Sequence, residues 1–205
     1  PSGCSFRWTS PEGEDAMEIL ASAQDIFFKQ PLAIAGRVLS GQCVLNVDAR
    51  HGPHVVHAEA AGVFYRGEDG LRMKQDIEAM REWLPQDLLG AWREVQKMPA
   101  GGARNALDWV LWQLMAAQRG EPVYRMAFLP SLRPLLTMVT LGVDEPQCMA
   151  AVAQSHPSAK ALKLKLSGEE LDIERVSAVR SARPDVTLSI DANEGWSMAH
   201  LERMM

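Results

Sequence analysis

The sequence predicts an α/β protein in which an N-terminal α+β domain is followed by about three βα units of a parallel sheet. Strand-like runs come first and are followed by helical patterns as far as about residue 119. From about residue 135 onward, short apolar runs alternate with helical patterns and the connections are short. About three units cannot close an eight-stranded (β/α) barrel, so we expect a partial barrel within these 205 residues.

The first domain is expected over residues 15–130, after a Gly-, Ser-, Pro- and Glu-rich stretch at 1–14 that we interpret as a leader or an expression remnant. Residues 17–28 are apolar with an ambiguous period, and could form a strand or a helix. Residues 42–49 and 54–60 have strand patterns, and the His-Gly-Pro turn between them predicts a hairpin.

Helical patterns follow over residues 70–84 and 86–97. A longer helix is expected over 103–119, because Gly120 ends it and Pro122 lies beyond. Its apolar residues recur at helical spacing: Leu107, Val110, Leu111 and Leu114.

The second domain is expected over residues 131–205 as strands and helices in strict alternation. The expected strands are 137–143, 161–166 and 186–191, and the expected helices are 146–155, 168–183 and 197–205. This order is typical of a parallel sheet whose strands all end at the same edge.

Composition excludes several kinds of partner. The net charge of −5 argues against binding driven by nucleic-acid phosphates or an anionic membrane surface. No apolar run approaches the length that spans a bilayer. The three cysteines are far apart and odd in number, which favours free thiols in a reducing, cytoplasmic setting.

The most informative residues are two lysines in an apolar strand and an aspartate at the end of the next strand. Lys163 and Lys165 are two apart, so they share one face of the strand. Two ammonium groups suit a packed core poorly. Asp191 ends the following strand, and adjacent parallel strands are about 4.8 Å apart, so the three groups can converge at one mouth.

This convergence indicates proton-transfer chemistry. A carboxylate suits a hard cation such as Mg²⁺. A lysine beside another cation and a metal ion has its charged form disfavoured, which favours the neutral amine that a general base requires. The metal can then stabilise the enediolate that forms when a proton next to a carboxylate is removed. The plainer interpretations are a solvated edge strand for the lysines and a helix N-cap for Asp191.

Four motifs carry a resemblance to a known family: PAGGARNALD at 99–108, Thr140, the Lys163-x-Lys165 pair and DANEGW at 191–196. From about residue 17 onward, the chain resembles the muconate-lactonizing branch of the enolase superfamily. It is most similar there to dipeptide epimerases of the L-Ala-D/L-Glu type. The resemblance implies an N-terminal capping domain followed by the first part of an enolase-type (β/α) barrel.

The resemblance also implies roles for individual residues. Lys165 corresponds to the acid/base lysine on one face of the substrate, and Lys163 to the partner that helps to hold the substrate carboxylate. Asp191 corresponds to the first of three Mg²⁺ ligands, and Asn193 is expected just outside the first shell of the metal.

Three further positions are expected to contact substrate. Thr140 corresponds to a substrate contact at the end of the first barrel strand. Two loops of the capping domain are expected to close over the barrel mouth, one over residues 34–40 with Arg37 and one over 62–68 with Tyr65. The Ile-Ala-Gly-Arg order of the first loop departs from the usual family pattern.

The family's remaining groups have no counterpart in these residues. They are two more metal carboxylates, a lysine on the opposite face and a late acidic pair. We therefore expect the 205 residues alone to be inactive and to be part of a longer polypeptide. The whole protein is expected to be an Mg²⁺-dependent dipeptide epimerase that abstracts and returns the α-proton of a small dipeptide or related carboxylate, as a monomer or a homo-oligomer.

Two alternatives stay open. The first is another enzyme of the same branch, namely a cycloisomerase, an o-succinylbenzoate synthase or an N-acylamino acid racemase, which would use the same lysines. The second is an inactive fragment that acts only as a binding or assembly module through an exposed strand edge.

Overall fold

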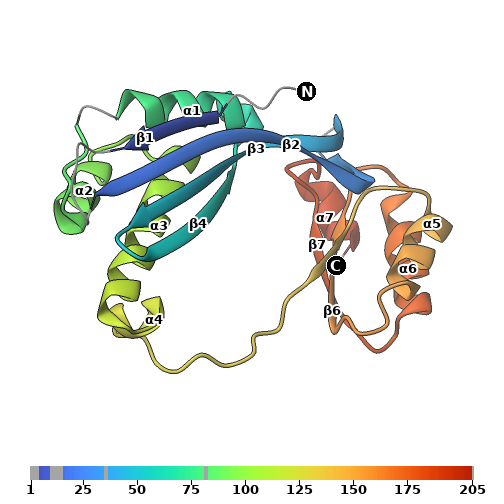
Figure 1. Ribbon diagram of the computed structural model, residues 1–205. Coiled ribbons are helices and arrows are strands. Elements are labelled where there is room, and N and C mark those ends of the chain that lie inside the picture. Colours follow the sequence, from blue (N-terminus) through green and yellow to red (C-terminus); the bar gives the residue numbers. More distant parts are fainter. Residues whose placement is uncertain (1–4, 10–15, 35–36, 81–82, 205) are drawn as a thin grey trace. The chain divides into compact units, whose positions relative to one another are not determined.

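The computed structural model describes residues 5–9, 16–34, 37–80 and 83–204 (Figure 1). Contacts divide the chain into two compact units. The first comprises Pro1–Phe27 and Gly41–Leu132, and the second comprises Phe28–Ser40 and Arg133–Met205. The division near residue 132 lies close to the boundary expected at 130, whereas the segment Phe28–Ser40 is grouped with the second unit.

The four-stranded sheet, most of which lies in the first unit, has the order β1-β2-β3-β4. Its strands are β1 (Ser5–Thr9), β2 (Met17–Ile34), β3 (Arg37–His51) and β4 (His54–Ala61). The ambiguous stretch at 17–28 is therefore strand, and the predicted hairpin at 42–60 is confirmed by the antiparallel pairing of β3 with β4.

The expected leader contains a strand. Ser5–Thr9 pairs antiparallel with β2, with Ser5 opposite Ser22 and Thr9 opposite Glu18. The sequence SFRWT alternates polar and apolar residues, which is the period of a strand. The expectation of a loose leader was therefore wrong for residues 5–9. The Gly-, Ser-, Pro- and Glu-rich residues around them hid this short alternating pattern.

Helices follow the strands in the first unit. They are η1 (Phe64–Arg66), α1 (Gly70–Ala79), α2 (Leu88–Val95), α3 (Gly102–Arg119) and α4 (Val123–Met126). The side chains of Asp69 and Asp87 cap α1 and α2 by accepting backbone N–H groups. Gly120 ends α3 with φ +63°, as the sequence predicts. The apolar face of α3 packs in one core with β2, β3 and β4.

The motif at 99–108 has a structural role within this unit. The carboxylate of Glu68 accepts the backbone N–H of Gly102 at 2.6 Å and that of Val63 at 3.2 Å. A β-carbon on Gly102 would run into the sulfur of the buried Met73, so a larger residue where α3 begins would require that side chain to move. This motif therefore joins the start of α3 to the loop before α1.

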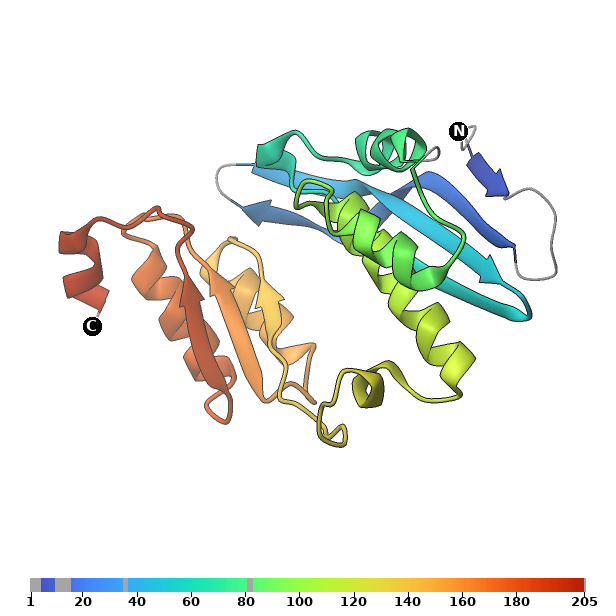
Figure 2. The same ribbon diagram turned by 90° about the vertical axis from the view of Figure 1, so that its left-hand side faces the viewer.

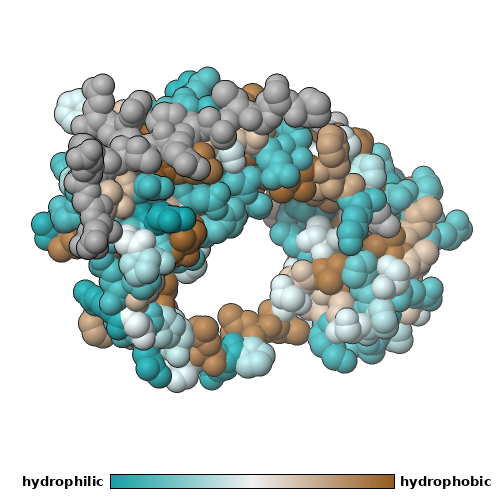
Figure 3. Space-filling model, viewed as in Figure 1, coloured by the Kyte–Doolittle hydropathy of each residue, from teal (hydrophilic) through white to brown (hydrophobic). Residues whose placement is uncertain are grey.

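The connection between α4 and β5 carries exposed apolar side chains. Phe128 is 94% exposed and Leu135 is 84% exposed, and Leu132 and Leu136 are exposed as well. In Figure 3 this stretch is the largely brown chain segment at the bottom of the view. Connections between elements are usually polar, and this one is not. Contiguous exposed apolar surface of this kind generally marks a site of contact with another molecule.

The second unit contains a parallel sheet of order β5-β6-β7. Its strands are β5 (Val139–Leu141), β6 (Ala161–Lys165) and β7 (Thr187–Asp191). Its helices are α5 (Pro146–Gln154), α6 (Asp172–Ala182) and α7 (Met198–Met204). The alternation of strand and helix predicted from residue 135 onward is confirmed, with each element slightly shorter than expected.

The core of the second unit lies between the sheet and the helices α5 and α6, which run side by side (Figure 2). Leu162 and Leu164 of β6 are fully buried on this face, against Met149 of α5 and Val179 of α6. In neither unit is any described helix both long enough and apolar enough to cross a bilayer.

Candidate active site

The strand β6 presents its two lysines on the face opposite to the helices. Because side chains alternate along a strand, burial of Leu162 and Leu164 against the helices directs Lys163 and Lys165 to the other face. Lys165 is opposite Asp191 in the parallel register, at the carboxyl ends of β6 and β7. The expected convergence of these groups at one edge of the sheet is therefore present.

One carboxylate oxygen receives both lysines. Lys165 Nζ donates to Oδ2 of Asp191 at 2.7 Å, and Lys163 Nζ lies 2.8 Å from the same oxygen. The two cations differ in environment, because the Lys165 side chain is 9% exposed and that of Lys163 is 37% exposed. Lys165 also donates to Oδ1 of Asn193 at 2.9 Å, so its ammonium is held on two sides.

The lysines set the charge state of Asp191. Hydrogen bonds from Lys163 and then Lys165 hold the pKa of the Asp191 carboxyl far below its ordinary value, and the backbone N–H of Asn193 adds to the effect. That N–H donates to Oδ1 at 3.0 Å. The carboxylate is therefore ionised at neutral pH, with both oxygens engaged.

A tight turn follows Asp191. Gly195 N–H donates to the carbonyl of Ala192 at 2.8 Å, and Asn193 and Glu194 have φ of +47° and +65°. Asparagine tolerates this left-handed region, whereas glutamate adopts it at a cost. Such a cost persists where the surrounding structure holds the chain, so this turn is a constrained element of the site.

The fit of a divalent cation rests on Asp191. Its ionised carboxylate supplies the oxygen that Mg²⁺ prefers. Within the described residues, no three His, Cys, Asp or Glu side chains are grouped so that they could hold a metal ion. Asp191 thus fits the chemistry of one ligand, and the described residues contain no complete ligand set.

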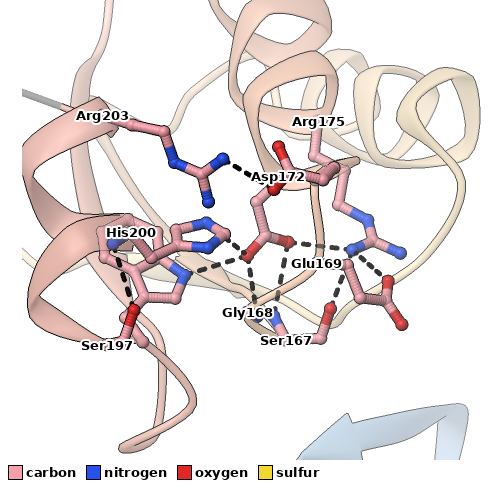
Figure 4. A network of polar contacts seen from close by, with 10 residues as sticks. Ser167, Gly168, Glu169, Asp172, Arg175, Ser197, His200 and Arg203 are labelled. Carbon is pink, nitrogen blue, oxygen red and sulfur yellow. Dashed lines mark hydrogen bonds and ion pairs between the residues drawn. The ribbon is translucent and has the colours of Figure 1, made fainter.

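A buried carboxylate binds both the loop that follows β6 and the loop that follows β7 (Figure 4). Asp172, fully buried at the start of α6, accepts the backbone N–H groups of Ser167 at 3.4 Å and Gly168 at 2.8 Å. It also accepts Nε1–H of Trp196 at 2.9 Å and Nη1–H of Arg175 at 2.9 Å. We call Asp172, Arg175 and Trp196 the loop clamp.

Arg175 extends the loop clamp to a third loop. Its Nε donates to the carbonyl of Asp144, after β5, at 2.8 Å, and its Nη1 donates to Ser167 Oγ and to the carboxylate of Glu169. The loops that follow β5, β6 and β7 therefore meet at one buried ion pair. Sequence reasoning missed Asp172 and Arg175. Their i,i+3 spacing was visible, but it is common on helices.

The other predicted site residues have separate outcomes. Thr140 lies beside Lys163 in the register of β5 and β6, on an exposed position of the strand. Tyr65 lies in η1 of the first unit, 75% exposed and edge-to-face with Phe64. Arg37 begins β3, and its side chain lies outside the described part of the chain. Substrate contact by these three residues stays a prediction.

No model of a known protein family matches the chain. It is, however, 40% identical over 106 residues to the L-Ala-D/L-Glu epimerase of Escherichia coli K12, covering 50% of this chain and 33% of that protein. It is 31% identical over 191 residues to a hydrophobic dipeptide epimerase of Roseobacter litoralis, covering 85% of this chain and 54% of that protein. An N-acetyl-D-glutamate racemase of Pseudoalteromonas and an o-succinylbenzoate synthase of Enterococcus faecalis also match.

Solved structures have the same fold. An enolase family member from Agrobacterium tumefaciens, solved with sodium and L-Ala-L-Glu, superposes with a TM-score of 0.80 at 28% identity, covering 92% of this chain and 57% of that chain. A dipeptide epimerase from Enterococcus faecalis V583, complexed with Mg and L-Leu-L-Tyr, gives 0.78 at 26% identity, covering 91% and 57%.

The fold and the site together define an α/β protein in which two lysines and an aspartate meet at the carboxyl ends of adjacent parallel strands. The chain is a homologue of the epimerases and racemases of the enolase superfamily. The expected fold class, an N-terminal α+β unit followed by the first part of an enolase-type barrel, is confirmed by these neighbours. The chain spans from one third to about half of the length of the curated relatives described above.

Proposed function

We propose that the natural protein is a dipeptide epimerase that removes and returns the α-proton of one residue of its substrate. The observation that carries the proposal is the meeting of Lys165, Lys163 and Asp191 at the carboxyl ends of two adjacent parallel strands. Homology to epimerases and racemases supports the reaction class.

Lys165 is the proposed acid/base group. In its neutral form Nζ would take the α-proton of one epimer, and in its charged form it would donate a proton to that same face when the other epimer is the substrate. Inversion then requires a second acid/base group on the opposite face of the substrate. Burial of Lys165 limits the exchange of its Nζ protons with bulk water, and the hydrogen bonds to Asp191 and Asn193 fix the position of Nζ. A base held in this way needs little reorganisation when a substrate arrives.

Lys163 is the proposed partner for the substrate carboxylate. Its ammonium is more exposed than that of Lys165 and shares the same Asp191 oxygen. A charge-assisted hydrogen bond from Lys163 would hold a carboxylate beside Lys165 and stabilise the negative charge that develops as the α-proton leaves.

Asp191 is the proposed protein ligand of a Mg²⁺ ion. The complex of the Enterococcus faecalis enzyme with Mg supports this choice of ion. When bound, the cation would supply positive charge that stabilises an enediolate form of the substrate carboxylate. Asn193 is proposed to remain outside the metal's ligands and to orient Lys165.

The substrate class divides the candidates. A dipeptide is favoured, because epimerases of dipeptides are among the matched relatives and the two solved structures described above contain L-Ala-L-Glu and L-Leu-L-Tyr. Racemisation of an N-acylamino acid is the second candidate, and the match to an N-acetyl-D-glutamate racemase at 34% identity supports it. Both reactions would use Lys165 in the same way.

The test is proton exchange in D₂O, followed by NMR of the α-hydrogen. The natural protein would be incubated with Mg²⁺ and a panel of L,L-dipeptides and N-acetylamino acids. We expect deuterium at one α-carbon of at least one dipeptide, and loss of exchange when EDTA removes the metal. Exchange only of N-acetylamino acids would favour the second candidate. No exchange with any member of the panel would contradict both and leave a binding or assembly role.

A further inference from the structure

The loop clamp is bonded to the chain segment that immediately follows the turn carrying Asp191 and Asn193. Trp196 follows this turn in sequence, and its indole N–H is bound by Asp172 at the start of α6. At the other end of the turn, the carbonyl of Asp191 accepts the N–H of Leu166 at 3.2 Å. The turn is therefore fixed at both ends, once to β6 and once to Asp172.

The two loops also touch through their backbones. A β-carbon on Gly168 would run into the carbonyl oxygen of Gly195, and Gly168 has φ +88°. The backbone N–H of Gly168 donates to the same Asp172 oxygen that accepts Trp196. One carboxylate thus sets the separation of the loop after β6 from the loop after β7.

Stability alone is a weak reason for a buried ion pair here. Replacing such a pair with apolar residues of similar volume is often neutral or stabilising, because desolvation offsets the attraction between the charges. What a carboxylate provides here is acceptance of four donors in defined directions, three from the loops after β6 and β7 and one from Arg175 of α6. These hydrogen bonds fix the position of the turn beside Lys165 relative to the loop after β6.

We propose that Asp172 is a positioning residue that, through Trp196 and Gly168, holds the 192–195 turn so that Asp191 and Asn193 face Lys165. Its action on the reaction rests on the proposed function. Its action on the turn does not, because the contacts lie within the second unit and can be measured without turnover.

The first experiment measures backbone amide hydrogen exchange by NMR in the intact chain. Trp196→Phe is the main variant, because it removes the N–H donor to Asp172 and keeps an aromatic ring. That ring can still stack on His200, whose ring centroid lies 5.2 Å from that of Trp196. We expect the amides of Asn193 and Gly195 to exchange roughly 10-fold faster or more, since hydrogen bonds to charged groups contribute enough for such a change. Asp172→Asn should act in the same direction.

Two control variants separate positioning from general destabilisation. Arg203→Gln removes an exposed ion pair with Glu170 that joins the loop after β6 to α7. It should leave the exchange rates of the Asn193 and Gly195 amides unchanged. Arg183→Lys disturbs a buried arginine that binds the carbonyls of Ala153, His156 and Ala159 at the other end of α6. It should lower global stability without a selective effect on Asn193 and Gly195.

The second experiment measures α-proton exchange kinetics in the natural protein. We expect Trp196→Phe and Asp172→Asn to lower kcat about 10-fold with a smaller change in KM, whereas Arg203→Gln keeps the original values. Unchanged amide exchange at Asn193 and Gly195 in Trp196→Phe, or an equal selective effect in Arg183→Lys, would overturn the proposal. Absence of turnover in the unmodified protein would count against the proposed function and leave the amide result to decide the role of Asp172.

Discussion

Lys165 and Asp191 are direct neighbours in the parallel register of β6 and β7, and their side chains meet at 2.7 Å at the strand ends. Lysine is almost never buried unless it is paired. Here the pairing leaves a buried ammonium next to an ionised carboxylate on the face opposite to the core. The pair places an amine beside a carboxylate oxygen, and the proposed reaction rests on this contact.

Replacing Lys165 with methionine should abolish the proposed proton transfer. The side chain keeps its length and its packing against the strand, but Nζ is lost. We expect α-proton exchange by the natural protein to fall by at least about 100-fold, the lower range of general acid–base contributions. The control is Lys160→Met, an exposed lysine just before the opposite end of β6, which should keep its activity. Comparable rates for Lys165→Met and the unmodified protein would exclude Lys165 as the base.

Replacing Asp191 with asparagine should destabilise the second unit. Two ammonium groups would then share a site without their carboxylate, and we expect unfolding free energy to fall by about 1–3 kcal/mol. Urea denaturation measures the change. The double variant Asp191→Asn with Lys163→Met should recover part of the loss, because it removes one of the two opposed charges. A double variant no more stable than Asp191→Asn would show that repulsion between the lysines is not the cause.

Local patterns predicted most of the elements that position the site. The alternation of short apolar runs and helices after residue 135 specified β6, α6 and β7 within a few residues. The two-residue spacing of Lys163 and Lys165 specified their shared face, because strand periodicity is a local property. The pairing of Lys165 with Asp191 followed once the strands were taken as parallel neighbours.

The loop clamp could not be predicted in the same way. Asp172 is bound by Trp196, which is 24 residues away, and Arg175 reaches Asp144, which is 31 residues away. Such contacts depend on loop paths, and a polar stretch such as SGEELD before a helix is equally typical of a solvated N-terminus. For the same reason, a short strand such as β1 was hidden in a polar segment until its partner strand was known.

Acid should weaken the second unit through its paired carboxylates. The hydrogen bond from Arg183 lowers the pKa of Asp185 from 3.8 to about 2. Burial alone would raise the pKa of Asp172, but its hydrogen bonds from Trp196 and Arg175 leave that pKa below its ordinary value. A carboxyl with a lowered pKa in the folded state stabilises the protein above its unfolded-state pKa, and this contribution is lost as the pH falls through the folded-state pKa.

We therefore expect the unfolding free energy to be level near neutral pH and to decrease below about pH 4, as measured by urea denaturation at a series of pH values. Asp185→Asn should make the decrease shallower. Glu174→Gln, an exposed carboxyl on the same helix as Asp172, serves as the control and should keep the original slope. A decrease of equal steepness in Asp185→Asn would show that this carboxyl does not contribute.

Gly168 should tolerate no side chain, and for two separable reasons. Its φ of +88° lies in the region that favours glycine, and a β-carbon there would meet the carbonyl of Gly195. Gly120 isolates the first reason, because it has φ +63° and no atom within 4 Å of an added β-carbon. We expect Gly120→Ala to cost about 1 kcal/mol of unfolding free energy from backbone strain alone.

Gly168→Ala should cost more than Gly120→Ala, because the loop after β6 must also move away from the loop after β7. That displacement would pull the N–H of Gly168 from Asp172, so the amide of Asn193 should exchange faster in Gly168→Ala and remain unchanged in Gly120→Ala. Urea denaturation measures the cost of each variant, and hydrogen exchange locates it. Equal costs together with unchanged exchange at Asn193 would show that the two loops adjust independently, and that the contact between Gly168 and Gly195 does not position the turn.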